Sequence, residues 1–190
     1  MRVMATGFSR KGESRMSNQD AWAVDPLHQV YAVADGVGGM LHGQRASHFA
    51  IQTLDFYAPQ MGLQPQAYRS CFQQISHQIY QMGQKVWGAG AKGCGTTLSV
   101  VKIEGQHAMI AHVGDSFVLH VHNQGYTVCT QTHTWAEAWR KRLGSRRGIS
   151  NAPSEIGIAP SAQALTRCLG QGGFLQVDVL RLEVSPGDWL

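Results

Sequence analysis

Two stretches with helical periodicity follow one another directly in the first half of the chain, with strand-like runs on either side. Apolar residues recur every three or four positions over residues 44–57 and again over residues 68–86. Short apolar runs typical of strands precede them at residues 21–24 and 30–34. A parallel sheet built from βαβ units would alternate strands with single helices. This order therefore predicts an α+β fold with mostly antiparallel pairing.

The second half of the chain carries strand-like runs again, joined by short polar turns. These runs cover residues 98–103, 108–113, 117–122, 126–130 and 175–184. The segment 131–165 is irregular, apart from one short helix predicted over residues 135–143. Two hairpins and a further strand are therefore expected after the helices.

Length and composition indicate one compact domain over residues 1–190, since 43% of the residues are hydrophobic. No run of about eighteen apolar residues is present, so we expect no membrane-spanning helix. The first residues lack the apolar core of a secretory signal. We therefore expect a cytoplasmic protein, and a monomer.

The net charge of +4 is local in origin. Residues 137–147 contain five basic side chains and one acid, and the rest of the chain is balanced. We therefore expect no nucleic-acid partner. The basic run is interpreted as a solvated surface, with docking of an acidic or phosphorylated substrate as the alternative. The four cysteines form no CxxC pair, which indicates buried thiols and neither a zinc site nor a disulfide framework.

Three aspartates stand in unusual settings. Asp35 and Asp115 each follow an apolar strand-like run and lie beside glycines, and Asp20 follows Arg-Met-Ser-Asn-Gln. A carboxylate at a strand end is held rigidly, and a neighbouring glycine allows a ligand to approach the backbone. Several carboxylates that converge repel one another unless a cation lies between them, and Mg²⁺ or Mn²⁺ prefers such oxygen ligands.

Six motifs occur in one order along the chain. They are Arg15-x-x-Asn-Gln-Asp20, Ala32-Val-Ala-Asp-Gly-Val-Gly-Gly39, Gly93-Cys-Gly-Thr-Thr-Leu98, Ala111-His-Val-Gly-Asp-Ser116, Leu165-Thr-Arg-Cys-Leu-Gly170 and Pro186-Gly-Asp-Trp-Leu190. The ordered set resembles the metal-dependent Ser/Thr protein phosphatases of type 2C (the PPM family) in their compact bacterial form. The resemblance implies a sandwich of two antiparallel sheets flanked by helix pairs, with a binuclear Mg²⁺ or Mn²⁺ centre at one end.

The resemblance also assigns roles to single residues. Asp35 is similar to the carboxylate that bridges both metals, and Gly36 to the residue whose carbonyl binds one of them. Asp20 resembles an acid that holds metal-bound water. Asp115 matches the ligand of a third, weaker metal in bacterial members, and Arg15 the residue that binds the substrate phosphate. The implied substrates are phosphoserine and phosphothreonine in proteins, with a Ser/Thr kinase as the partner system.

The chain also departs from the family pattern. Val37 stands where many eukaryotic relatives carry a histidine, and the sequence ends before the motifs that hold the family's last metal ligands. We therefore expect a domain that is incomplete at its C-terminus and has reduced or no activity. A fragment of a longer protein is the favoured explanation, with a naturally shortened form as the alternative. The alternative hypothesis is a catalytically impaired module that binds phosphoproteins or a regulator. A nucleotide phosphate loop at residues 35–39 is disfavoured, because neither GxGxxG nor GxxxxGK[ST] is present.

Several other polar residues are interpreted as structural. His120 and His122 lie two positions apart on one predicted strand, so both side chains point to the same face. We predict an exposed pair, with metal binding as the alternative. His112 is expected to pack within its strand. The hydroxyls of Thr96 and Thr97 are expected to serve strand packing, with a place near the metal site as the alternative.

Overall fold

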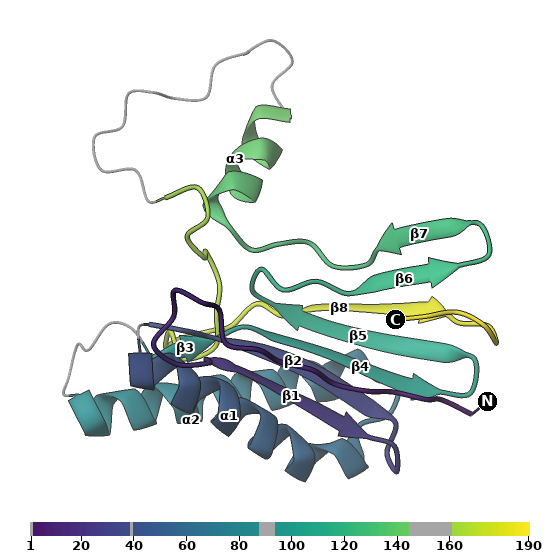
Figure 1. Cartoon of the computed structure of the whole chain (residues 1–190), viewed down its shortest axis with the longest axis horizontal. Coiled ribbons are helices and arrows are strands. Elements are labelled where there is room, and N and C mark those ends of the chain that lie inside the picture. Colours follow the sequence, from purple (N-terminus) through teal and green to yellow (C-terminus); the bar gives the residue numbers. More distant parts are fainter. Residues whose placement is uncertain (1, 39, 88–93, 145–160) are drawn as a thin grey trace.

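The computed structural model describes residues 2–38, 40–87, 94–144 and 161–190. Two strands come first, two long helices follow, and strands dominate the remainder (Figure 1). The strands are β1 (Asp20–Asp25), β2 (Val30–Val37), β3 (Gly95–Thr96), β4 (Leu98–Glu104), β5 (His107–Val113), β6 (Leu119–His122), β7 (Gly125–Val128) and β8 (Asp178–Glu183). The helices are α1 (Met40–Tyr57), the 3-10 turn η1 (Ala58–Gln60), α2 (Pro65–Trp87) and α3 (Trp135–Gly144).

The larger sheet is antiparallel throughout, with strand order β1-β2-β4-β5-β8 and with β3 paired to the end of β2. β6 and β7 form a separate hairpin. The predicted helix at residues 44–57 begins earlier than expected, at Met40. Gly43 weakens the helical signal in the sequence, yet it lets the first turn pack closely against β2.

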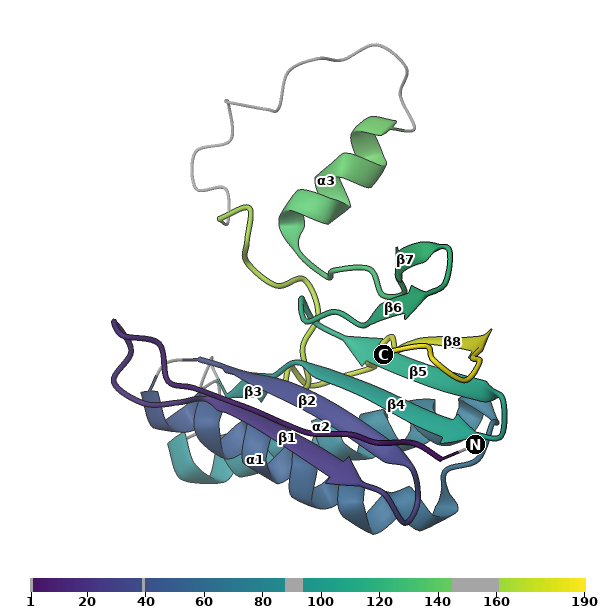
Figure 2. The same cartoon turned by 45° about the vertical axis from the view of Figure 1, so that its right-hand side comes forward.

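α1 and α2 lie together against one face of the larger sheet (Figures 1 and 2). Every second side chain of each strand points to these helices, since side chains in a strand alternate between the two faces of the sheet. The cluster between helices and sheet includes the buried side chains of Leu54, Tyr68, Phe72, Ile75, Ile79, Val100 and Met109. Burying each large apolar side chain stabilises the fold by about 1.5–3 kcal/mol. The apolar stripe predicted over residues 68–86 is therefore core from Tyr68 to Ile79.

The opposite face of the sheet carries a second cluster. Val101, Ile103, Ala108 and Ile110 pack there with Val118, which leads into the β6–β7 hairpin. An isolated bridge joins Val121 of that hairpin to Trp189. The expected fold class is confirmed: antiparallel sheets in two layers, with a helix pair on the larger one. Within the described ranges, no helix is long and apolar enough to cross a membrane.

Candidate active site

Asp20 and Asp35 lie directly opposite each other where β1 begins and β2 nears its end. Ala21 and Ala34, their neighbours, are buried in the cluster under the helices. Alternation therefore turns both carboxylates to the other face of the sheet, where both residues are exposed. Directly paired residues on antiparallel strands have Cβ atoms about 4.5–5.5 Å apart, so two negative charges meet here.

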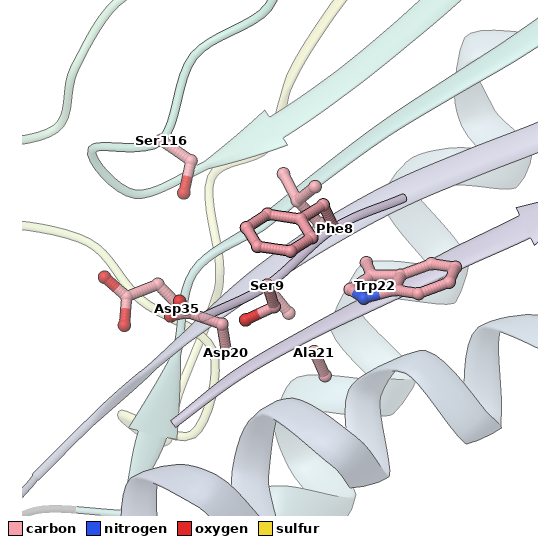
Figure 3. A pocket seen from close by; sticks show the side chains of 9 residues that line it. Phe8, Ser9, Asp20, Ala21, Trp22, Asp35 and Ser116 are labelled. Atoms are coloured by element: carbon pink, nitrogen blue, oxygen red, sulfur yellow. The ribbon is translucent and has the colours of Figure 1, made fainter. Parts of the chain in front are cut away.

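A pocket of about 230 Å³ opens beside this pair. Figure 3 shows the Asp20 and Asp35 side chains side by side at one end of it, with Ser116 on the loop after β5 above them. Phe8 and Trp22 lie at the other end (Figure 3). The pocket thus has an acidic end and an apolar end.

The carboxyl group of Asp35 has a raised pKa. Its carboxylate is exposed at the pocket, but neighbouring protein atoms partly desolvate it and so raise its pKa. The charges of Asp20 and Asp115 raise it further, and Arg15 opposes them, with the pKa shifted from 3.8 to about 6. The charges of two other carboxylates therefore act on Asp35 in this place.

Two threonines fix the backbone around Asp35. The Asp35 N–H donates to Thr97 Oγ1 at 2.8 Å, and the Asp35 carbonyl accepts from Thr96 Oγ1 at 3.0 Å. Thr97 Oγ1 also lies 2.9 Å from Ser116 Oγ, in the loop that carries Asp115. The Thr97 hydroxyl thus connects the strand end at Asp35 with the Asp115 loop, and both hydroxyls do more than the packing that the sequence indicated.

The backbone at Gly36 is held against the first turn of α1. A Cβ on Gly36 would lie 2.2 Å from the carbonyl of Gly43, and one on Gly43 would lie 2.8 Å from the Gly36 oxygen. Gln19 O accepts hydrogen bonds from the Gly36 N–H at 3.1 Å and from Ser47 Oγ at 2.6 Å. Both glycines are needed because the two backbones touch.

Other predicted residues differ in their setting. Arg15 is exposed, and its charge acts on Asp35. His120 is not the exposed side chain that was expected: it is only 14% exposed, because the last turn folds back and brings Asp188 Oδ2 to 2.9 Å from its Nε2. His112 is buried in β5, as predicted.

The basic run of residues 137–147 divides at the end of α3, and its last part lies outside the described residues. Arg140 pairs with Glu137 within that helix at 2.7 Å. In the described part of the chain, no group of three or more His, Cys, Asp or Glu side chains is arranged to hold a metal ion by itself. A bound ion would need further oxygen ligands, such as backbone carbonyls and water.

Comparison with known proteins gives the family. The model for protein phosphatase 2C matches residues 10–139, which is more than half of the chain. The chain belongs to the protein phosphatase 2C family. The predicted resemblance is thereby confirmed, and the matched range includes Arg15, Asp20, Asp35 and Asp115.

Individual proteins and solved structures are also similar to this chain. The protein phosphatase PhpP of Streptococcus pneumoniae is 26% identical over 186 residues, covering 94% of this chain and 72% of PhpP. The Ser-Thr phosphatase MsPP of Mycobacterium smegmatis, solved with cacodylate, is 26% identical with a TM-score of 0.72, covering 94% of this chain and 72% of MsPP. The catalytic domain of the phosphatase PstP, solved with two manganese ions, has a TM-score of 0.76 at 21% identity, covering 95% of this chain and 72% of that domain.

Proposed function

We propose that this chain is a metal-dependent protein serine/threonine phosphatase that hydrolyses phosphoserine and phosphothreonine. The observation that carries the proposal is the pair of facing carboxylates, Asp20 and Asp35, with the charge of Asp115 close enough to raise the pKa of Asp35. Mutual repulsion of this kind is relieved by a cation. Membership of the protein phosphatase 2C family and the manganese ions of PstP support the same reading.

The residues present fit Mn²⁺ or Mg²⁺ as the cofactor, because carboxylate and carbonyl oxygens are the ligands that such ions prefer. Asp35 and the Gly36 carbonyl would hold two ions, Asp115 a third and weaker one, and Asp20 would orient water beside them. When bound, such ions supply a nucleophilic water at neutral pH and neutralise the phosphoryl oxygens.

Arg15 would bind the substrate phosphate. It is exposed close to the acids, and a guanidinium donates two parallel hydrogen bonds to phosphate oxygens. The proposed partners are phosphoproteins in the cytoplasm and the Ser/Thr kinase that modifies them. The proposed domain spans residues 1–190 and acts as a monomer.

The decisive experiment measures hydrolysis of a phosphothreonine peptide with Mn²⁺, using the complete product of the gene. We expect turnover that a chelator abolishes, and loss of turnover to background in Asp35→Ala. Asp55→Ala is the matched control, since Asp55 is an exposed acid on α1, on the other side of the sheet. Turnover that survives Asp35→Ala would refute the proposal.

A second candidate function is a phosphoprotein-binding module without turnover. The absence, in the described residues, of a group of three metal-holding side chains favours it. Calorimetry with Mn²⁺ separates the two candidates. Binding of Mn²⁺ together with turnover excludes the module, whereas phosphopeptide binding without Mn²⁺ uptake supports it.

A further inference from the structure

The backbone N–H and the backbone carbonyl of Gly114, immediately before Asp115, are both hydrogen-bonded to histidines. Its N–H donates to His133 Nδ1 at 3.0 Å. Its carbonyl accepts from the His133 backbone N–H at 2.7 Å and from His112 Nε2 at 3.1 Å. Gly114 has φ of +120°, and a Cβ there would lie 2.5 Å from Thr97 Cβ. Glycine is therefore required at this position, and the peptide planes on both sides of it are fixed.

The partners of His133 determine which ring nitrogen carries the proton. An amide N–H can only donate, so Nδ1 of His133 accepts, and the proton of the neutral ring is on Nε2. Nε2 then donates to Asp178 Oδ2 at 3.1 Å, while Asp178 Oδ1 accepts from Arg167 at 2.9 Å. Asp178 is the first residue of β8 and pairs with His112 in the sheet register. The sheet thus anchors the carboxylate that orients the imidazole.

His133 is well suited to a fixed and neutral role. The residue is 3% exposed, and its ring lies 4.9 Å from the His112 ring, centroid to centroid. Burial lowers the pKa of His133, although the hydrogen bond to Asp178 opposes this. A charged ring would place an Nδ1–H against the Gly114 N–H, two donors facing each other. The neutral ring is the form that fits.

We infer that His133 is a positioning residue, whose Nδ1 holds the Gly114 N–H and thereby sets the Asp115 carboxylate beside Asp35. The same turn is held from the other side by the contact between Thr97 and Ser116. The inference rests on the proposed function in one respect only, namely that Asp115 binds a metal ion. The positioning itself is a property of the metal-free protein.

Two variants separate the two hydrogen bonds of the ring. The amide oxygen of Asn occupies the place of Nδ1, so His133→Asn keeps an acceptor for Gly114 and loses the bond to Asp178. The longer side chain of His133→Gln reaches towards Asp178 in place of Nε2 and offers Gly114 no acceptor. Each variant loses one hydrogen bond of the buried ring, so both should lower the unfolding temperature.

The first measurement is the solvent exchange of the Gly114 amide proton, followed by NMR in the metal-free protein. We expect protection in the wild type and in His133→Asn, and at least tenfold faster exchange in His133→Gln. The second measurement is Mn²⁺ binding by calorimetry, in which we expect about tenfold weaker binding at the weakest site in His133→Gln only.

These measurements distinguish failure of the inference from failure of the proposed function. Equal Gly114 exchange in both variants, or equal Mn²⁺ affinities in both, would overturn the inference even if the wild type is an active phosphatase. A wild type that protects Gly114 through His133 but binds no Mn²⁺ would refute the proposed function and still support the positioning of Asp115.

Discussion

Among single residues, Asp35 shows most directly how the charges of this site lower the stability of the metal-free fold. Desolvation and the charges of Asp20 and Asp115 raise its pKa from 3.8 to about 6. A group with a raised pKa contributes stability that is complete below its unfolded pKa and is lost as the pH rises through its folded pKa. In the metal-free protein this contribution is therefore present near pH 4 and gone above pH 6.

Asp35→Asn should remove the loss of stability that the wild type shows as the pH rises. We expect the metal-free variant to unfold at a higher temperature than the wild type at pH 7.5, and the two to converge as the pH falls towards 4, since the wild-type carboxyl is then protonated. Thermal unfolding followed by circular dichroism in a chelator measures the difference. A variant less stable than the wild type at pH 7.5 would show that the charged carboxylate of Asp35 does not destabilise the fold.

The sequence predicted the residues of this site unevenly. Asp20 and Asp35 could be singled out because each stands in a short motif, and Asp35 also follows an apolar run and precedes a glycine. The pair Gly114 and His133 could not, because nineteen positions and the β6–β7 hairpin separate them along the chain. The role of Asp178 could not be predicted either, since its position beside His133 depends on the pairing of β8 with β5. Contacts between distant segments leave no periodic trace.

Among the elements, the crossing of β2 and α1 is the tightest contact near the site. The backbones of Gly36 and Gly43 touch there, so a methyl group on either has no space. Gly43→Ala should push the helix from the strand, destabilise the fold by about 1–3 kcal/mol, and weaken Mn²⁺ binding through the displaced Gly36 carbonyl. Chemical denaturation and calorimetry measure the two effects.

Gly62→Ala is the matched control for this change. Gly62 lies between η1 and α2, and a Cβ there would meet nothing within 4 Å. Removing glycine from such a position is neutral or stabilises by about 0.4–1 kcal/mol through the unfolded chain. If both variants lose the same stability, or if Gly43→Ala leaves Mn²⁺ affinity unchanged, the contact does not position the Gly36 carbonyl.

Elements themselves were largely predictable, because helical and strand periodicities are properties of short windows. The glutamine-rich face of α2 is a partial exception. Gln74, Gln78 and Gln81 are exposed, but Gln73 donates to Gly173 O at 2.9 Å and accepts from the Leu175 N–H at 2.8 Å. A polar residue on a helix can bind a distant loop, and its sequence neighbours do not reveal this.

For the molecule as a whole, the order of strands in the sheet could not be derived from sequence pattern alone. β8 pairs with β5 across the segment that contains the β6–β7 hairpin and α3. Such pairing brings Asp178, His133 and the Asp115 loop together at the sheet end where Asp20 and Asp35 meet. The family resemblance implied this architecture, whereas periodicity only implied its parts.

A fold that gathers like charges at one sheet end should gain stability from a divalent cation. A ligand that binds only the native state, at about a hundred times its dissociation constant, stabilises by about 2.7 kcal/mol. For a domain of this size that corresponds to a rise of roughly 5–10 °C in Tm. Mn²⁺ should therefore raise Tm by this amount in the wild type, and a chelator should reverse the rise.

Comparison with Asp35→Asn tests whether this rise in Tm comes from an ion bound at Asp35. The variant is expected to start from a higher Tm without metal and to gain almost nothing from Mn²⁺, so the two proteins exchange their order of stability as Mn²⁺ is added. The exchange follows because the repulsion that destabilises the metal-free wild type is also what attracts the ion. Equal Mn²⁺-induced shifts in both proteins would show that the ion binds elsewhere.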